Sequence, residues 1–267
     1  MIDIHSHLLP QIDDGSTSWD ESIAMARQAV VDGTTELAVT HHIISNKEFG
    51  REPEILEKFS EMKKRLVAEK IALKLHLGSE IFYQHEVDLK PRIATLNNTG
   101  KYFLVEFPME GIPRGADEKF FALIMEGTIP IIAHPERNVG FMKNPSRAFD
   151  FVQRGALMQM NAGSLTGKYG ESVKDLATAM MNSQLIHFAG SDGHNTKRRP
   201  MHMGEAYRIV CDTWGEKTAQ QIFFDNPRKM LAGEDLRVPE PLPVEPVKKD
   251  SLLNSVRLLK KLVSSSE

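Results

Sequence analysis

Seven short apolar runs, separated by longer amphipathic stretches, constrain the fold of this chain more than any other feature of its sequence. Each run has the length of a strand and is apolar almost throughout or at alternate positions, as in strands of a covered parallel sheet. The runs are Met1–Ile4, Glu36–Thr40, Ile71–Leu77, Tyr102–Phe107, Ile129–Ala133, Ala156–Met160 and Leu185–Ala189.

Helical patterns lie between the runs. Ser18 and Glu21 have capping-box spacing and predict a helix that continues to about Val31, with Gly33 placed to end it. Apolar residues recur at helical spacing in the next interval, while charged residues take the other positions. The further predicted helices are Glu54–Lys70, Asp117–Met125, Pro145–Arg154, Glu171–Asn182, Gly204–Thr213 and Lys217–Phe224.

The alternation of strands and helices indicates an α/β fold with a parallel sheet. Seven such units fit into residues 1–236, which we predict to form one domain. This number of units favours a closed or nearly closed, TIM-like barrel. A doubly wound open sheet is the alternative, and periodicity alone does not separate the two.

The character of the sequence changes after residue 236. Residues 237–249 are predicted to be a stiff, proline-rich linker, and residues 250–267 a basic amphipathic tail. Such a helix can lie on an anionic membrane surface or dock on a partner. We favour the simpler interpretation, in which it packs on its own barrel or on another subunit of a homo-oligomer, or frays.

Side chains that can bind metals stand at the ends of the runs. In a parallel barrel the carboxyl ends of all strands meet on one face, where active sites form, so residues far apart in the sequence should converge there. The run ends carry His5 and His7, His41 and His42, Glu80, Glu106, His134, Asn161, and Asp192 and His194.

The residue types at these ends point to a metal centre. His5 and His7 are two positions apart, so both side chains share one face of an extended segment. Imidazole and carboxylate ligands together suit Zn, Mn or Fe, and the carboxylates supply charge for two or three divalent ions. A single histidine or glutamate of this kind is more often structural, but repetition at so many strand ends favours ligands. Spacing does not separate His41 from His42.

Two arginines add a second signal. Arg137 follows His134 by three residues, and Arg199 follows His194 by five. A guanidinium beside clustered metals suits a phosphate or a carboxylate, because its fork matches two oxygens at once. The alternative is a structural or surface salt bridge, which is the favoured interpretation for Arg198.

Other classes of protein fit the sequence less well. The net charge of −3 argues against a nucleic-acid partner. Cys211 is the only cysteine and reads as a small buried hydrophobe, because position 217 lacks the arginine of a thiol phosphatase. There is no apolar stretch of membrane-spanning length and no pattern of a secretory signal, so we expect a soluble, cytoplasmic protein.

Together these motifs resemble the PHP (polymerase and histidinol phosphatase) superfamily. They are more closely similar to the CpsB/CapC/YwqE-type bacterial protein-tyrosine phosphatases of capsule and exopolysaccharide systems. The resemblance covers roughly Met1–Leu231. The motifs are His5-x-His7, Asp13-Asp14-Gly15, Thr40-His41-His42, Gly78-Ser79-Glu80-Ile81, Glu106-Phe107-Pro108, Ala133-His134-Pro135-Glu136-Arg137 and Ser191-Asp192-Gly193-His194.

The resemblance implies a distorted (β/α)7 barrel with a trinuclear site, often of manganese, with iron or zinc as alternatives. It favours His42 over His41, and it makes Arg137 and Arg199 the phosphate-binding arginines. The metal ligands that it implies are His5, His7, Asp14, His42, Glu80, Glu106, His134, Asp192 and His194.

The expected function is hydrolysis of phosphotyrosine on a protein by a metal-activated water. The resemblance alone makes a tyrosine kinase of polysaccharide export the natural partner. One alternative is the same chemistry on a small molecule such as histidinol phosphate. An amidohydrolase-like enzyme would normally need a bridging lysine, which no strand end supplies, and a non-catalytic metal-binding module is the remaining alternative.

Overall fold

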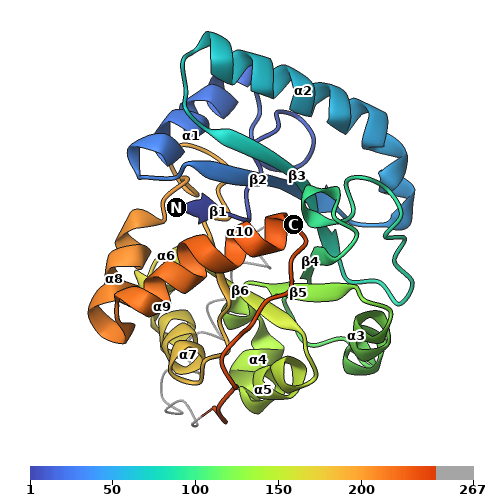
Figure 1. The fold of residues 1–267 in the computed structure, drawn as a ribbon, viewed down its shortest axis with the longest axis vertical. Coiled ribbons are helices and arrows are strands. Elements are labelled where there is room, and N and C mark those ends of the chain that lie inside the picture. The colour runs from blue at the N-terminus through green and yellow to red at the C-terminus, as the bar shows by residue number, and fades with distance from the viewer. Residues whose placement is uncertain (245–267) are drawn as a thin grey trace.

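Seven parallel strands form a single sheet in the order in which they occur along the chain (Figure 1). The computed structural model describes residues 1–244. Each predicted run contains or overlaps one strand, so the predicted α/β barrel is confirmed. The strands are β1 Ile2–Asp3, β2 Glu36–Ile43, β3 Lys74–Phe82, β4 Tyr102–Glu106, β5 Ile129–Ala133, β6 Leu157–Asn161 and β7 Phe188–Gly190.

The sheet curls until its two ends meet. Ser6 and Gly193 form a parallel bridge just beyond β1 and β7. Two backbone hydrogen bonds support it: the His7 N–H donates to the Gly193 carbonyl at 2.9 Å, and the Asp192 N–H donates to the His5 carbonyl at 2.9 Å. The result is a nearly closed barrel, and the open doubly wound sheet does not apply.

Helices cover the outside of the barrel (Figure 1). They are α1 Trp19–Val31, α2 Glu52–Ala68, α3 Ala116–Met125, α4 Val139–Lys143, α5 Ser146–Gln153, α6 Ala162–Leu165, α7 Glu171–Asn182, α8 Gly204–Trp214, α9 Glu216–Gln220 and α10 Asn226–Leu231. Short turns complete the set: η1 Asn46–Arg51, η2 Leu96–Asn98, η3 Pro135–Arg137 and the π-turn η4 Gln221–Asp225.

Two helix predictions need correction in detail. The Ser18 side chain accepts a bond from the Glu21 N–H, but the Glu21 carboxylate accepts from Thr17, so only half of the capping box forms. The helix predicted to end at Phe224 instead continues through the π-turn into α10. Pro227 lies at the start of α10, directly after the π-turn, where the change of hydrogen-bond pattern accommodates a residue without an N–H.

The barrel interior divides into an apolar base and a polar mouth. Interior side chains from the strands form a buried apolar layer that includes Ala38, Leu104 and Leu157, and Met230 and Leu231 of α10 belong to the same cluster. Because alternate residues of a strand face the same side, later interior positions of the same strands lie at their carboxyl ends. These positions are His42 on β2, Glu106 on β4 and Asn161 on β6.

After α10 the chain runs back over the barrel (Figure 1). The Tyr102 hydroxyl donates to the Glu234 carbonyl at 2.7 Å, and the Leu242 N–H donates to the Ser183 carbonyl at 2.9 Å. The first part of the predicted linker therefore lies against the domain, without helix or strand. The rest of that linker and the whole predicted tail lie outside the described residues. No helix within residues 1–244 is long and apolar enough to cross a membrane.

Candidate metal centre

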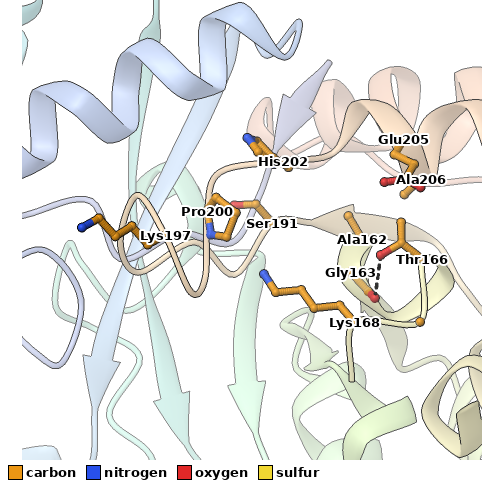
Figure 2. Close-up of a pocket in the computed structure, with 11 residues that line it drawn as sticks. Ala162, Gly163, Thr166, Lys168, Ser191, Lys197, Pro200, His202, Glu205 and Ala206 are labelled. Atoms are coloured by element: carbon orange, nitrogen blue, oxygen red, sulfur yellow. Dashed lines mark hydrogen bonds between the residues drawn. The ribbon is translucent and has the colours of Figure 1, made fainter. Parts of the chain in front are cut away.

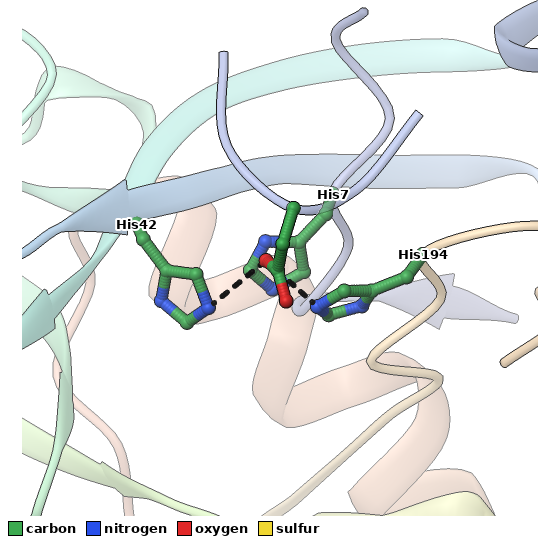
Figure 3. Close-up of side chains that lie close together, drawn as sticks. His7, His42 and His194 are labelled. Carbon is green, nitrogen blue, oxygen red and sulfur yellow. Dashed lines mark ion pairs between the residues drawn. The ribbon is translucent and has the colours of Figure 1, made fainter. Parts of the chain in front are cut away.

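All nine ligand residues that the sequence predicts meet at the carboxyl-end mouth of the barrel. The rings of His7, His42 and His194 face one another there, although they come from distant parts of the chain (Figure 3). Ring centroids are 3.8 Å apart for His7 and His194 and 4.6 Å apart for His7 and His42. Glu80 stands at the centre, because its Oε2 lies 3.1 Å from His5 Nε2, 3.3 Å from His7 Nε2 and 3.2 Å from His42 Nδ1.

The ligand atoms fall into three overlapping groups. Within each group the atoms lie within 4.8 Å of one another. His134 and Asp192 adjoin these groups: His134 Nε2 is 2.9 Å from Glu80 Oε1, and Asp192 Oδ1 is 3.6 Å from His7 Nε2. The three groups are His7, Asp14, His42 and His194; His5, His7 and Glu80; and His42, Glu80 and Glu106.

The residues present fit divalent metal ions. His42 Nδ1 and Asp192 Oδ1 are buried and have no hydrogen-bond partner within residues 1–244. Burying such polar atoms without partners is costly, so atoms of this kind point to a ligand. The donor set is imidazole nitrogen and carboxylate oxygen, which is the set that Mn, Fe and Zn share.

Asp13, whose only sequence signal was its place beside Asp14 in a motif, holds His7 in place. Its Oδ2 lies 2.7 Å from His7 Nδ1 and also accepts from the His42 backbone N–H at 2.9 Å. An ionised carboxylate only accepts, so His7 Nδ1 keeps its proton, and Nε2, which faces Glu80, is the nitrogen that can exchange its proton for an ion. Asp13 therefore fixes which nitrogen His7 offers to an ion.

A chain of amides does the same for His5. Its Nδ1 lies 2.8 Å from Gln159 Oε1, and the Gln159 amide donates to Asn161 Oδ1 at 3.0 Å. Asn161 in turn donates to Asp192 Oδ2 at 2.6 Å. Gln159 was not predicted, because a glutamine inside a strand run carries no signal of its own. These hydrogen bonds hold the His5 ring so that its Nε2 is directed at the cluster.

His194 is oriented by an arginine. The Arg199 guanidinium donates to His194 Nε2 at 2.8 Å, while His194 Nδ1 lies 3.0 Å from the Asp192 carbonyl. Arginine has no acceptor, so Nε2 must bear the lone pair and Nδ1 the proton. Burial, with help from the charge of His7, lowers the pKa of His194 to about 4, which keeps the ring neutral.

The backbone at the mouth is adapted to this cluster. His134 and Asp192 adopt left-handed backbone conformations, with φ of 33° and 52°. Residues other than glycine rarely adopt such conformations. Gly190 leaves the space that His5 needs, because a Cβ there would lie 2.7 Å from His5 Cβ and 2.9 Å from Gln159 Nε2.

The structure separates His42 from His41. Successive strand residues point to opposite faces, so only His42 faces the barrel mouth. His41 is buried on the other side, where its Nε2 lies 3.2 Å from the Ser79 hydroxyl. Burial lowers the pKa of His41 to about 4. The geometry therefore agrees with the choice that the resemblance implied.

The carboxylates make the mouth attractive to cations. Burial alone would lower the pKa of His7, but Asp13 and Glu80 outweigh it and raise that pKa to about 10. Burial and then the charge of Glu80 raise the pKa of Glu106 to about 7. Protons and metal ions compete for such a cluster, so metal binding here should release protons.

Arg137 and Arg199 both reach the cluster through Asp192. Arg137 Nη1 lies 2.9 Å from Asp192 Oδ2, and Arg199 forms an ion pair with the same oxygen. Arg137 also stacks 4.5 Å over the Tyr169 ring, and Arg199 Nε is a buried donor without a partner among the described residues. Arg198 is exposed instead. Both predicted phosphate-binding arginines therefore lie beside the candidate ligands and have further N–H groups that could bind a phosphate.

Comparisons with known proteins agree with this geometry. Residues 1–232 match the family described as capsular polysaccharide synthesis, CpsB/CapC. The chain is 38% identical over 250 residues to the tyrosine-protein phosphatase YwqE of Bacillus subtilis, covering 92% of this chain and 97% of that protein. It is 32% identical over 241 residues to the tyrosine-protein phosphatase CpsB of Streptococcus pneumoniae, covering 86% and 98%.

The fold gives the same result. A crystal structure from a study of YwqE from Bacillus subtilis and CpsB from Streptococcus pneumoniae, described as unique metal-dependent tyrosine phosphatases, superposes with a TM-score of 0.85. The match has 36% sequence identity and covers 92% of this chain and 100% of that one.

Proposed function

The chain belongs to the CpsB/CapC family, and on that premise we propose that its barrel mouth removes phosphate from tyrosine residues of a protein. It is a metal-dependent tyrosine phosphatase of the YwqE/CpsB type. The observation that carries the proposal is the convergence of nine ligand side chains beside two arginines in a chain of this family.

The nine side chains at the mouth would hold two or three divalent ions, with manganese as our first choice and iron or zinc as alternatives. Bound there, such ions acidify a water molecule and neutralise charge on phosphoryl oxygens. The three overlapping groups of ligand atoms support more than one ion, since Glu80 belongs to two of them and His7 and His42 to two each.

The arginines would bind and orient the phosphate. Their positive charge is already concentrated beside Asp192, and their forked donors match pairs of phosphate oxygens. Tyr169 holds the Arg137 guanidinium flat from one side, which limits its freedom before the substrate arrives. Donors fixed in advance stabilise the charge that develops on phosphate oxygens during transfer. The leaving phenolate has a pKa near 10, so it departs readily.

The substrate, by extension of the family's part in capsule synthesis, would be a tyrosine kinase of polysaccharide export. We place the reaction in the cytoplasm, because tyrosine phosphorylation needs ATP. Both statements rest on the family and on the chemistry of the modification.

The test compares substrates on metal-depleted enzyme. A phosphotyrosine peptide, the matching phosphoserine peptide and histidinol phosphate are offered with Mn, Fe or Zn added back. We expect restored turnover with the highest kcat/KM on phosphotyrosine. A higher value on histidinol phosphate would make the protein a small-molecule phosphatase, and bound metal without turnover would favour a non-catalytic module.

A further inference from the structure

A cavity of about 390 Å³ opens next to the metal centre and is not used by the mechanism above (Figure 2). Ser191 contributes to its wall and directly precedes Asp192 in the chain, so the cavity and the metal centre share a strand end. The opposite walls come from α6 with the turn after it, and from the start of α8. The volume is at the small end of ligand pockets and suits one side chain with its backbone.

Lys168 supplies the positive charge inside this cavity. Its side chain extends from the cavity's edge toward Ser191 and Pro200, whereas Lys197 points away from it (Figure 2). The Lys168 side chain is exposed, and its ammonium has no hydrogen-bond or ion-pair partner within residues 1–244. The Lys168 Nζ lies 5.8 Å from the centroid of the Tyr169 ring. An unpaired ammonium that lines a cavity can form an ion pair with an anionic ligand there.

The fold holds Lys168 in that position. Its backbone N–H donates to the Gly163 carbonyl at 3.0 Å, which tightens the turn after α6. Gly163 has no side chain, and a Cβ there would lie 3.0 Å from Lys168 Cδ and 3.1 Å from Tyr169 Cε2. The lysine stem therefore packs onto the bare face of the glycine. This packing directs the side chain along the cavity, toward Ser191.

The electrostatic surroundings favour an anion. Burial and then the charge of Arg199 lower the pKa of Lys168, with Asp192 acting in the opposite direction. Glu205 is the one acidic residue of the cavity wall, and it is exposed on the first turn of α8. A carboxylate placed beside the Lys168 ammonium would relieve the repulsion between this lysine and the arginines.

We propose that this cavity binds the carboxylate side chain of an aspartate or glutamate that flanks the phosphotyrosine in the protein substrate. The inference rests on the proposed function and adds a sequence preference to it. An extended peptide advances about 3.3 Å per residue, and Ser191 and Asp192 are neighbours in the chain. The acidic residue should therefore stand within two positions of the phosphotyrosine.

The experiment uses phosphotyrosine peptides with alanine at the four positions from two before to two after the phosphotyrosine. Each position in turn carries Asp or Asn, which have the same shape and differ in charge. The readout is the ratio of kcat/KM for the Asp peptide to that for the Asn peptide, measured on the metal-loaded full chain. We expect a ratio of about five at one position, which corresponds to about one ion pair.

Three variants test whether the preference for Asp over Asn arises from Lys168 in the cavity. In Lys168→Gln the ratio should fall to about one, because the charge is lost while the stem remains. Gly163→Ala should lower it as well, since Lys168 is displaced but still present. Lys64→Gln, on the exposed side of α2, should keep the wild-type ratio.

Two results overturn the proposal in different ways. A wild-type ratio near one at all four positions, or an unchanged ratio in Lys168→Gln, would refute the acidic subsite and leave the phosphatase intact. Failure to hydrolyse any phosphotyrosine peptide would refute the proposed function itself, and the subsite with it.

Discussion

Side chains that touch the ligands decide which atom each histidine offers to an ion. Asp13 acts on His7, Gln159 on His5, and Arg199 on His194. Asp13 and Gln159 hold Nδ1 of His7 and His5 and leave Nε2 directed at the cluster. Arg199 instead donates to His194 Nε2, which keeps that nitrogen unprotonated where it faces Asp14. Of these partners, the Asp13 carboxylate accepts hydrogen bonds from His7, Gly15 and His42.

Asp13→Asn should weaken metal binding and turnover by about 10- to 100-fold. Asp13 Oδ2 accepts from both His7 Nδ1 and the His42 N–H, and an amide cannot place an oxygen there and still accept at Oδ1 from Gly15. The measurement is the Mn dissociation constant together with kcat. Asp20→Asn, on the exposed first turn of α1, is the matched control. Unchanged Mn affinity in Asp13→Asn would refute this positioning role.

Arg137→Lys and Arg199→Lys should each lower kcat/KM by about 100-fold, because lysine keeps the charge but loses the fork. Arg137→Lys should leave the bound metal unchanged, whereas Arg199→Lys should also weaken metal binding, because Arg199 orients His194. Metal content is measured by elemental analysis and kcat/KM on a phosphotyrosine peptide. Arg198→Lys should have little effect, since Arg198 is exposed. If Arg198→Lys were as damaging as Arg199→Lys, the assignment between the two neighbours would be wrong.

All candidate ligands except Asp14 were predictable from sequence because each ends or follows a strand run, and strand ends of a parallel barrel converge. Asp14 came from the family resemblance. The partners were harder to predict. Asp13 lies in a loop and Gln159 inside a strand, and nothing in their spacing marks them as contacts of His7 and His5. Spacing alone could not separate His41 from His42, because it does not show which face of β2 points into the barrel, and only the resemblance favoured His42.

Among the elements, the pair β6 and β7 has a titratable group beside it that links stability to pH. His187 is buried beside these strands, and its Nδ1 accepts from the Met158 N–H at 3.0 Å. Burial lowers the pKa of His187 to about 3. Below pH 6.5 the unfolded chain takes up a proton that the folded chain refuses, so stability falls as the pH drops from about 6.5 toward 3.

His187→Gln should therefore reduce the loss of stability between pH 7.5 and pH 5.0, by about 2 kcal/mol at most. The free energy of unfolding is measured with urea in metal-depleted protein, so that proton competition at the metal centre does not differ between variants. His202→Gln, an exposed histidine, is the control. The same pH dependence in wild type and His187→Gln would contradict the role given to this residue.

Strands were easier to predict than the helices at the end of the chain. Seven apolar runs of strand length leave few alternative assignments of secondary structure, and each of the seven contains or overlaps a strand of one sheet. The segment from α9 to α10 was predicted too short, because Asn226–Pro227 looks like a helix end. Tertiary packing of Met230 and Leu231 on the barrel base supports the continuation instead, and sequence spacing does not show that contact.

For the molecule as a whole, the barrel separates stability at its base from chemistry at its mouth. Leu231 of α10 belongs to the buried apolar layer at the base. Leu231→Ala should lower the free energy of unfolding by about 3 kcal/mol, through lost burial and the cavity that remains. Metal content and kcat per folded molecule, measured well below the melting temperature, should stay at wild-type values. A fall in Mn affinity as large as the fall in stability would show that base and mouth are coupled.

We infer that the cluster at the mouth binds two or three metal ions and hydrolyses phosphotyrosine only when they are bound. The most direct test titrates metal-depleted enzyme with Mn while bound Mn and turnover of a phosphotyrosine peptide are followed together. We predict that activity appears as two to three equivalents bind, and that His5→Ala binds fewer ions without turnover. Full activity in the metal-depleted enzyme, or in metal-poor His5→Ala, would contradict the claim.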